Sequence, residues 1–249
     1  MSFTEQASIG LLSDIHYDGG AKAMNRLYEA VSALNAGGVE ALVVMGDLVN
    51  GTSGSHARRL LREVSALCDA FRGPVRYMPG NHDLDHLSKA EFYSALGCAD
   101  SASRFHFELG GHEVVCIDGN FSPDGTEYDR GNFDWPESFV PEEQLDWLRG
   151  RLAASLLPVV VLSHQRIDKE SRFAVRNHAA VREVVSLSGK VKAVFQGHNH
   201  EDDLLRIGET AYYTLAAHAD DAGPAAAELD AKGIRLIRDY QARKALQHA

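Results

Sequence analysis

Residues 75–83 read VRYMPGNHD and join a short apolar run to a group of polar residues. The run at 75–78 has the length and the apolar content of a buried strand, and the Pro-Gly pair behind it ends that strand. Asn81, His82 and Asp83 follow directly. Ligands of open α/β sheets bind outside the carboxyl ends of the strands, so this stretch predicts a polar site at a sheet edge.

Four further apolar runs end in the same way. They occupy residues 9–12, 41–45, 159–162 and 193–195, and the polar residues behind them include Asp14, His16, Asp47, His164, His198 and His200. Because the carboxyl ends of parallel strands meet at one edge of a sheet, we expect these side chains to lie close together. Gly46, Gly80 and Gly197 each precede one of these residues, where the chain must turn sharply and approach a neighbour closely.

Helical patterns separate most of these runs. Apolar residues recur at helical spacing over residues 24–37, 57–71, 141–152 and 179–187. This alternation predicts an α/β protein with helices on both sides of the central strands. We also expect a hairpin over residues 106–117 and antiparallel strands at 212–216, 226–230 and 234–237. The chain has no linker or repeat, which favours a single domain over residues 1–249.

The composition argues against several classes of protein. Lys and Arg number 25 and Asp and Glu 35, so the net charge is 25 − 35 = −10 with His neutral. This acidic balance disfavours binding to extended nucleic acid or to an anionic membrane surface. The three cysteines lack the spacing of a disulfide framework or a zinc ribbon. No apolar run is long enough to span a membrane and no signal-peptide pattern is visible, so we expect a cytoplasmic protein.

The polar residues at the strand ends have the chemistry of a metal centre. Carboxylates, imidazoles and one amide oxygen, without a thiolate, suit Mn²⁺, Fe, Zn²⁺ or Co²⁺. Seven such side chains are too many for one catalytic metal ion and suit two divalent ions with open positions. Ser13 and Asn50 flank these residues and could hydrogen-bond them, although each could equally be a plain turn residue.

In this order the polar blocks resemble the five signature blocks of the calcineurin-like metallophosphoesterases, and the resemblance covers positions 14–200. It implies a four-layer α/β/β/α sandwich of two packed sheets. It also implies a division of the ligands: Asp14, His16 and His200 bind one ion, Asn81, His164 and His198 bind a second, and Asp47 bridges both.

The resemblance further implies a mechanism. A hydroxide that bridges the two ions attacks phosphorus in line, and His82 protonates the leaving oxygen or stabilises the transition state. Asp83 could orient the His82 imidazole, or it could only cap a turn. His86 and Arg166 are candidates for substrate contacts, with an ordinary surface position or a surface ion pair as the competing interpretation.

Several reactions fit the resemblance, and we favour hydrolysis of a small phosphodiester such as a nucleotide or a glycerophosphodiester. A phosphomonoesterase and a pyrophosphatase of nucleoside-diphosphate compounds are the alternatives. A protein-binding scaffold of the same fold is the non-enzyme alternative, but such relatives typically lose ligands or the acid His, and this chain keeps them. The net charge disfavours a DNA nuclease. The sequence Leu84-Asp85 after the GNHD block, without the Arg-bearing residues of protein phosphatases, favours small substrates.

Residues 119–139 have little periodicity but are rich in aromatic side chains: Phe121, Tyr128, Phe133, Trp135 and Phe139. This content favours a packed and ordered loop. Such a loop could set substrate specificity together with residues 165–177, or it could form a contact between two copies of the chain in a homo-oligomer.

Overall fold

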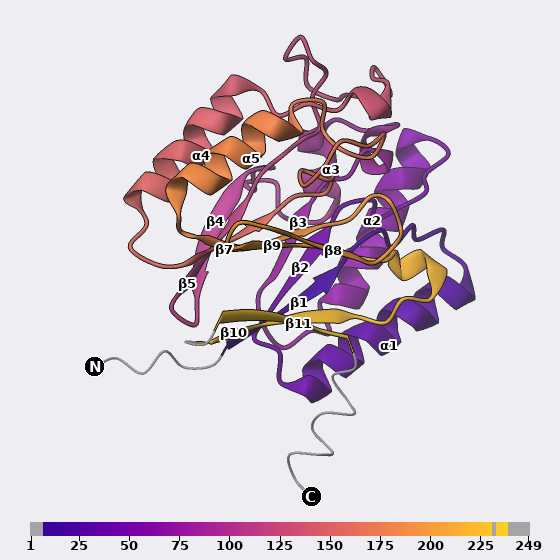
Figure 1. The fold of residues 1–249 in the computed structure, drawn as a ribbon. Coiled ribbons are helices and arrows are strands. Elements are labelled where there is room, and N and C mark those ends of the chain that lie inside the picture. Colours follow the sequence, from indigo (N-terminus) through magenta and orange to yellow (C-terminus); the bar gives the residue numbers. More distant parts are fainter. Residues whose placement is uncertain (1–6, 231–232, 239–249) are drawn as a thin grey trace, which may run out of the picture.

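The computed structural model describes residues 7–230 and 233–238, and these contain two β-sheets (Figure 1). The strands are β1 (Ala7–Leu12), β2 (Ala41–Met45), β3 (Val75–Met78), β4 (Phe105–Leu109), β5 (His112–Cys116), β6 (Val159–Leu162), β7 (Val191–Gln196), β8 (Asp203–Ile207), β9 (Thr210–Thr214), β10 (Ala225–Asp230) and β11 (Gly233–Ile237). The first sheet has the order β11-β10-β1-β2-β3 and the second the order β4-β5-β6-β7-β9-β8.

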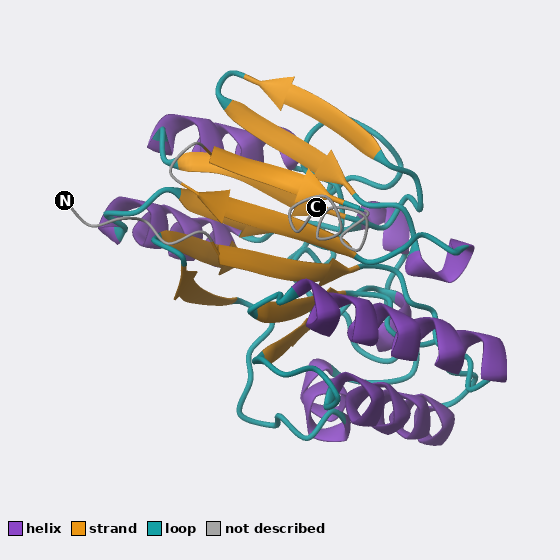
Figure 2. Ribbon diagram, turned by 90° about the horizontal axis from the view of Figure 1, so that it is seen from below, coloured by secondary structure: helices purple, strands orange, loops and turns teal. Residues whose placement is uncertain are grey.

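Helices cover the outer face of each sheet, which gives four layers. Apolar side chains of α1 (Ala21–Gly37), α2 (Gly54–Cys68) and α3 (Lys89–Ala95) pack with the first sheet. Those of α4 (Glu142–Ala154) and α5 (His178–Ser188) pack with the second sheet. A third apolar cluster, which includes Ile9, Val43, Val160 and Phe195, joins the two inner sheet faces. Figure 2 shows the helices outside and the strands between them. The predicted α/β/β/α sandwich is confirmed.

The central strands are parallel, as their apolar runs predict. β1 pairs with β2 and β2 with β3 in parallel, and β5, β6, β7 and β9 form a second parallel series. The side chains of β1, β2 and β6 are buried throughout, because these strands are covered on both faces. Each fully buried aliphatic side chain contributes about 1.5–3 kcal/mol to stability.

The predicted hairpin is formed by β4 and β5, which pair in antiparallel orientation around Gly110 and Gly111. The expectation for the final strands is correct for β10 and β11, which pair with each other in antiparallel orientation, as β10 does with β1. It is only partly correct for β9, which is antiparallel to β8 but parallel to β7. None of the helices in the described residues is long and apolar enough to cross a membrane.

Candidate metal centre

The predicted ligands lie in the loops that follow β1, β2, β3, β6 and β7, at the carboxyl edges of the two sheets. Backbone hydrogen bonds tie these loops together: Asp14 N–H donates to Gly46 O and His16 N–H donates to Asp47 O. Five of the residues have positive φ angles, namely Asp14, His16, Asp47, His198 and His200 at 54°, 45°, 51°, 73° and 63°. A positive φ angle costs energy for a non-glycine residue, and residues with this conformation cluster at functional sites.

Glycines allow this close packing of loops. A Cβ atom on Gly80 would lie 2.1 Å from Asp47 Oδ1, and one on Gly197 would lie 2.0 Å from Ser13 Oγ. Gly46 has φ +91°, and a Cβ there would lie 2.4 Å from His164 Nδ1. These contacts confirm the prediction that the three glycines serve sharp turns and close approaches.

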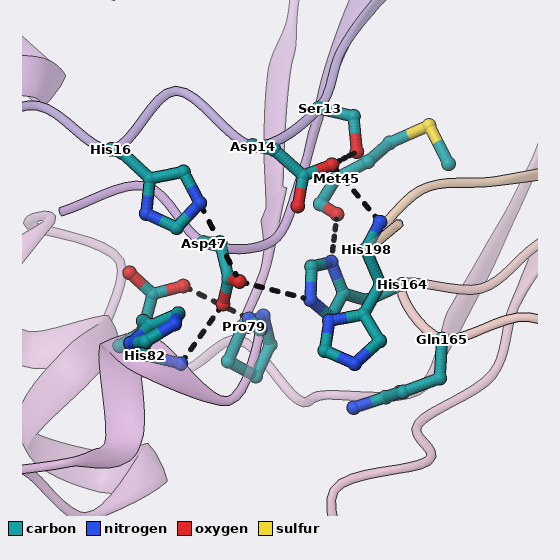
Figure 3. A network of polar contacts seen from close by, with 12 residues as sticks. Ser13, Asp14, His16, Met45, Asp47, Pro79, His82, His164, Gln165 and His198 are labelled. Atoms are coloured by element: carbon teal, nitrogen blue, oxygen red, sulfur yellow. Dashed lines mark hydrogen bonds and ion pairs between the residues drawn. The ribbon is translucent and has the colours of Figure 1, made fainter. Parts of the chain in front are cut away.

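The side chains form two clusters, Asp14-His16-His200 and Asp47-His164-His198. In each cluster the potential ligand atoms lie within 4.8 Å of one another. Asp47 lies between the clusters, with Oδ2 3.8 Å from His16 Nε2 and 3.4 Å from His164 Nε2 (Figure 3). The structure thus brings six of the seven predicted ligands into two metal-sized groups, and buried Asn81 lines the same pocket.

The polar atoms inside the clusters fit metal ions. Within the described residues, several buried atoms have no hydrogen-bond partner: Asp14 Oδ1, Asn81 Oδ1, His164 Nε2 and both ring nitrogens of His198. A buried polar atom without a partner costs about 1–3 kcal/mol, so such a concentration demands an occupant. Burial lowers the pKa of His198 to about 3, which keeps its imidazole neutral, as a metal ligand must be.

Three imidazoles are held through the ring nitrogen that points away from the clusters. His16 Nδ1 lies 2.8 Å from Asn50 Oδ1, His164 Nδ1 lies 2.9 Å from Met45 O, and His200 Nδ1 lies 3.0 Å from Asp220 Oδ2. These acceptors hold a proton on Nδ1 and leave the lone pair of Nε2 directed inward. The Asn50 contact fits one of the two interpretations of that residue, whereas Met45 and Asp220 were not foreseen.

Asp83 fits the second of its two interpretations, a cap of the backbone, and not the first, a partner of the His82 imidazole. The Asp83 carboxylate is fully buried and accepts hydrogen bonds from the backbone N–H groups of Leu48, Val49 and Gly80 at 2.9–3.1 Å. It therefore fixes the loops, and the residue that contacts the imidazole is Asp85, with Oδ2 3.0 Å from His82 Nδ1. This hydrogen bond raises the pKa of His82 to about 9.

The two residues predicted to contact substrate lie in different environments. Arg166 is 3% exposed, and its guanidinium pairs with Asp168 at 2.9 and 2.5 Å and with Asp203 at 2.7 Å. This fits the competing interpretation of an ion pair, although a buried one, and a contact of Arg166 with substrate stays a prediction. His86 is exposed beyond η1 (His82–Leu84), and its role stays a prediction.

The aromatic segment 119–139 is packed, and it adds a residue to the site. Tyr128 is fully buried, and the Phe133 ring stacks on it with a centroid distance of 3.9 Å. Trp135 lies in η2 (Trp135–Glu137) and, with Phe173, lines a pocket of about 320 Å³. The other lining residues are Asp47, Asn81, His82, His198, Asn199 and His200.

The fold and the clusters define a class: two-sheet α/β proteins with an Asp/His centre for two metal ions at the strand ends. The sequence profile of the calcineurin-like phosphoesterases matches residues 7–202, and the chain belongs to this family. The protein named "Probable cyclic nucleotide phosphodiesterase" of Fibrobacter succinogenes is 22% identical over 219 residues, 82% of this chain and 77% of that protein.

Solved structures agree with this fold. A dimetal phosphatase from Danio rerio has a TM-score of 0.79 at 19% identity, covering 93% of this chain and 98% of its own. An anchor protein of the inner membrane complex of Plasmodium has a TM-score of 0.69 at 14% identity, covering 95% and 85%. The chain is therefore a metal-dependent phosphoesterase by family, with a fold shared by proteins of different names.

Proposed function

We propose that this protein is a phosphodiesterase that hydrolyses a small phosphodiester, a nucleotide or a glycerophosphodiester, with two divalent metal ions. The observation that carries the proposal is the pair of adjacent Asp/His clusters at one pocket, where several buried inward atoms lack hydrogen-bond partners in the described parts of the chain. Mn²⁺, Fe, Zn²⁺ and Co²⁺ all suit this mixture of carboxylate and imidazole ligands.

Each ligand would hold one ion or both. Asp14, His16 and His200 would hold the first ion, and Asn81, His164 and His198 would hold the second. Asp47 would contribute to both, because its Oδ2 lies near His16 Nε2 of one cluster and His164 Nε2 of the other. When bound, two such ions lower the pKa of a water molecule and offset negative charge on the phosphate oxygens.

His82 supplies the proton for the leaving oxygen. Its side chain is 45% exposed at the mouth of the pocket, and its ring centroid lies 5.2 Å from that of His16. Because Nδ1 is engaged by Asp85, Nε2 is the nitrogen that can donate to a substrate. Asp85 keeps the ring charged and oriented, which is the role that the sequence suggested for Asp83.

The charge of the pocket supports a diester over a monoester. Among the described residues, its lining includes no Lys or Arg, and Arg166 is bound to Asp168 and Asp203. A phosphomonoester carries nearly two negative charges near neutral pH, and beside His82 no described lining side chain adds a cation to bind the second one. A diester carries a single charge. The printed name of the Fibrobacter succinogenes relative points the same way.

A substrate screen tests the proposal. The chain is stripped of metal with a chelator, loaded with Mn²⁺, and assayed on bis-p-nitrophenyl phosphate, p-nitrophenyl phosphate, cyclic nucleotides and nucleotide-diphosphate sugars. We expect the diesters to be hydrolysed with the highest kcat/KM. A clear preference for p-nitrophenyl phosphate would make the protein a monoesterase, and a preference for the diphosphate sugars would make it a pyrophosphatase.

The variant His82→Ala tests the role of the proposed acid. We expect it to keep two equivalents of metal and to lose turnover by about 10²- to 10⁴-fold, the usual contribution of a general acid. Asp85→Asn should have a smaller effect of the same kind, because it leaves the imidazole in place. Unchanged turnover in His82→Ala would remove this residue from the mechanism.

A scaffold without catalysis is the second candidate, because the fold also occurs in the Plasmodium anchor protein. Metal content separates the two candidates directly. Two equivalents of Mn²⁺ per chain after loading and dialysis support the enzyme, and less than one equivalent supports the scaffold. The same proposal includes a cytoplasmic location and no partner among extended nucleic acids or membranes. It also includes a contact between two copies of the chain through residues 119–139.

A further inference from the structure

The wall of the pocket next to His198 is made of two aromatic rings. Trp135 and Phe173 lie at a centroid distance of 5.7 Å with an interplanar angle of 22°, so their faces are nearly parallel. Both meet the His198 ring edge-on, at 5.2 Å and 82° for Trp135 and 5.6 Å and 79° for Phe173. A pair of rings thus borders the second Asp/His cluster directly.

These two rings are only partly buried, whereas Tyr128 in the same region is fully buried. Tyr128 and Phe133 stack on each other and supply the packing that orders residues 119–139. Trp135 and Phe173 instead line the open pocket. Leaving aromatic area exposed forgoes about 25 cal/mol per Å², so rings kept at a pocket wall are suited to a ligand that covers them.

The segments that carry the two rings are fixed to each other. Arg176 N–H donates to Ser138 O at 2.8 Å, and the Arg176 guanidinium pairs with Glu137 at 2.7 Å. The backbone of Phe173 accepts a hydrogen bond from Arg166 N–H at 3.0 Å. The backbone segments that carry the rings are therefore held before any ligand arrives, which lowers the entropy cost of binding.

The charge next to the rings selects among possible ligands. The guanidinium of exposed Arg172 lies over the two rings, 4.7 Å from the centroid of Trp135 and 5.6 Å from that of Phe173. This positive charge repels a quaternary ammonium, the other group that aromatic walls commonly bind. A flat and uncharged ring, such as a nucleobase or an aryl group, can stack on the same surface without that repulsion.

We infer that Trp135 and Phe173 form a platform on which a flat ring of the substrate stacks while its phosphate lies at the Asp/His clusters. This inference rests on the proposed function and narrows it, because it favours nucleoside-containing diesters over glycerophosphodiesters with aliphatic or choline groups. Trp135 and Phe173 are then the residues that determine specificity.

Binding of matched phosphates tests the platform without turnover. AMP and ribose 5-phosphate differ only in the base, and phenyl phosphate and ethyl phosphate differ only in the ring. The chain has two tryptophans, so in a Trp147→Phe background the fluorescence reports Trp135 alone. With Mn²⁺ bound, we expect AMP and phenyl phosphate to quench this signal and to bind about 10- to 100-fold more tightly than their partners.

Variants then locate the effect by calorimetry. Trp135→Leu and Phe173→Leu should reduce the affinity for AMP toward that for ribose 5-phosphate and leave the affinity for ribose 5-phosphate unchanged. Trp135→Phe keeps a ring and should retain most of the discrimination. Phe133→Leu, in the same segment but outside the pocket lining, is the matched control and should retain all of it.

Either of two results with the unchanged platform would overturn it: equal affinities within both ligand pairs, or no saturable quenching by AMP. An equal loss of affinity for AMP and for ribose 5-phosphate in Trp135→Leu would also overturn it, as would tighter binding of phosphocholine than of AMP. Failure of the proposed function looks different: ring discrimination persists while no phosphodiester is hydrolysed. Hydrolysis without ring discrimination removes the platform and leaves the phosphodiesterase.

Discussion

The two Asp/His clusters differ in depth and in what holds their imidazoles. Asp47, His164 and His198 are all buried, whereas in the other cluster only Asp14 is buried and the His200 side chain is 37% exposed. His164 is oriented by a backbone carbonyl at the end of β2, Met45 O. His16 and His200 are oriented by side chains, Asn50 and Asp220.

One half of the centre is therefore buried throughout, whereas the two imidazoles of the other half lie closer to the surface. A side-chain substitution cannot remove the backbone carbonyl of Met45, whereas the Asp220 side chain can be replaced without changing a residue of the hydrophobic core. We therefore expect changes in the buried cluster to affect both stability and metal binding, and changes around the exposed cluster to affect metal binding alone.

The largest effect is expected at the residue that joins the two halves. Asp47→Ala should lose both ions and reduce turnover by about 10³-fold or more, because it removes the bridge between them. Metal analysis after dialysis and steady-state kinetics measure the two quantities. Asp47→Asn keeps the shape of the side chain and separates loss of charge from loss of packing. Two retained equivalents of metal in Asp47→Ala would contradict the bridging role.

The second prediction compares one imidazole from each half. In the metal-free chain, His164→Ala should lower the free energy of unfolding by about 2–4 kcal/mol, because it leaves a cavity in the interior. His200→Ala should lower it by less than about 1 kcal/mol, because its side chain is at the surface. Urea denaturation measures both values. Equal losses of unfolding free energy in the two variants would show that the difference in burial between the two imidazoles does not affect stability.

The third prediction addresses the carboxylate behind His200. Asp220→Asn should weaken binding of one ion by about 10- to 100-fold and leave the other unchanged, as expected when the partner of a metal-binding imidazole is removed. Calorimetric titration with Mn²⁺ resolves the two steps. Glu209→Gln, which removes an exposed carboxylate on the β8–β9 turn, is the control. A loss shared equally by both ions would argue against a specific role for Asp220.

The smallest effect concerns η3 (His218–Asp220), the short helix that carries Asp220. His218 is buried beside Arg26, and burial lowers its pKa from 6.5 to about 4. Between pH 6.5 and 4, His218 binds a proton in the unfolded chain but not in the folded chain. The free energy of unfolding therefore falls as the pH falls through this range. At pH 5 the cost is about 1–2 kcal/mol. In metal-free protein, His218→Gln should reduce this dependence of the free energy of unfolding on pH, and His86→Gln is the control. An unchanged pH dependence in His218→Gln would show that His218 is not its source.

The sequence predicts the fold, and it predicts that the candidate ligands lie close together, because both depend on local patterns. A buried strand is a run of apolar residues, each candidate ligand lies within five residues of such a run, and the structure brings six of the seven into two groups. The choice between the two interpretations of Asp83 also has a local basis: His82–Leu84 forms a 3₁₀ turn, in which residues three apart lie on the same side. Asp85, three residues after His82, is therefore the carboxylate that lies beside the imidazole. A 3₁₀ turn at this point of the sequence would have predicted this contact.

Other features could not be read from the sequence because they depend on distant contacts. Arg166 is bound by Asp203, 37 residues away, and no pattern around either residue reports the pair. Asp220 reaches His200 across 20 residues that include β8 and β9. The abundance of aromatic residues at 119–139 is visible, but only packing separates buried Tyr128 from Trp135 at the pocket.

The order of strands in the first sheet has a consequence for the synthesis of the chain. β1 lies between β2 and β10, so one edge of the strand that positions Asp14 and His16 is covered by a strand from near the other end of the sequence. The ribosome has to translate residues 13–224 between β1 and β10. Until β10 is made, β1 presents an open edge on that side. The strand that positions Asp14 and His16 therefore gains its second neighbour only after every other candidate ligand has been translated.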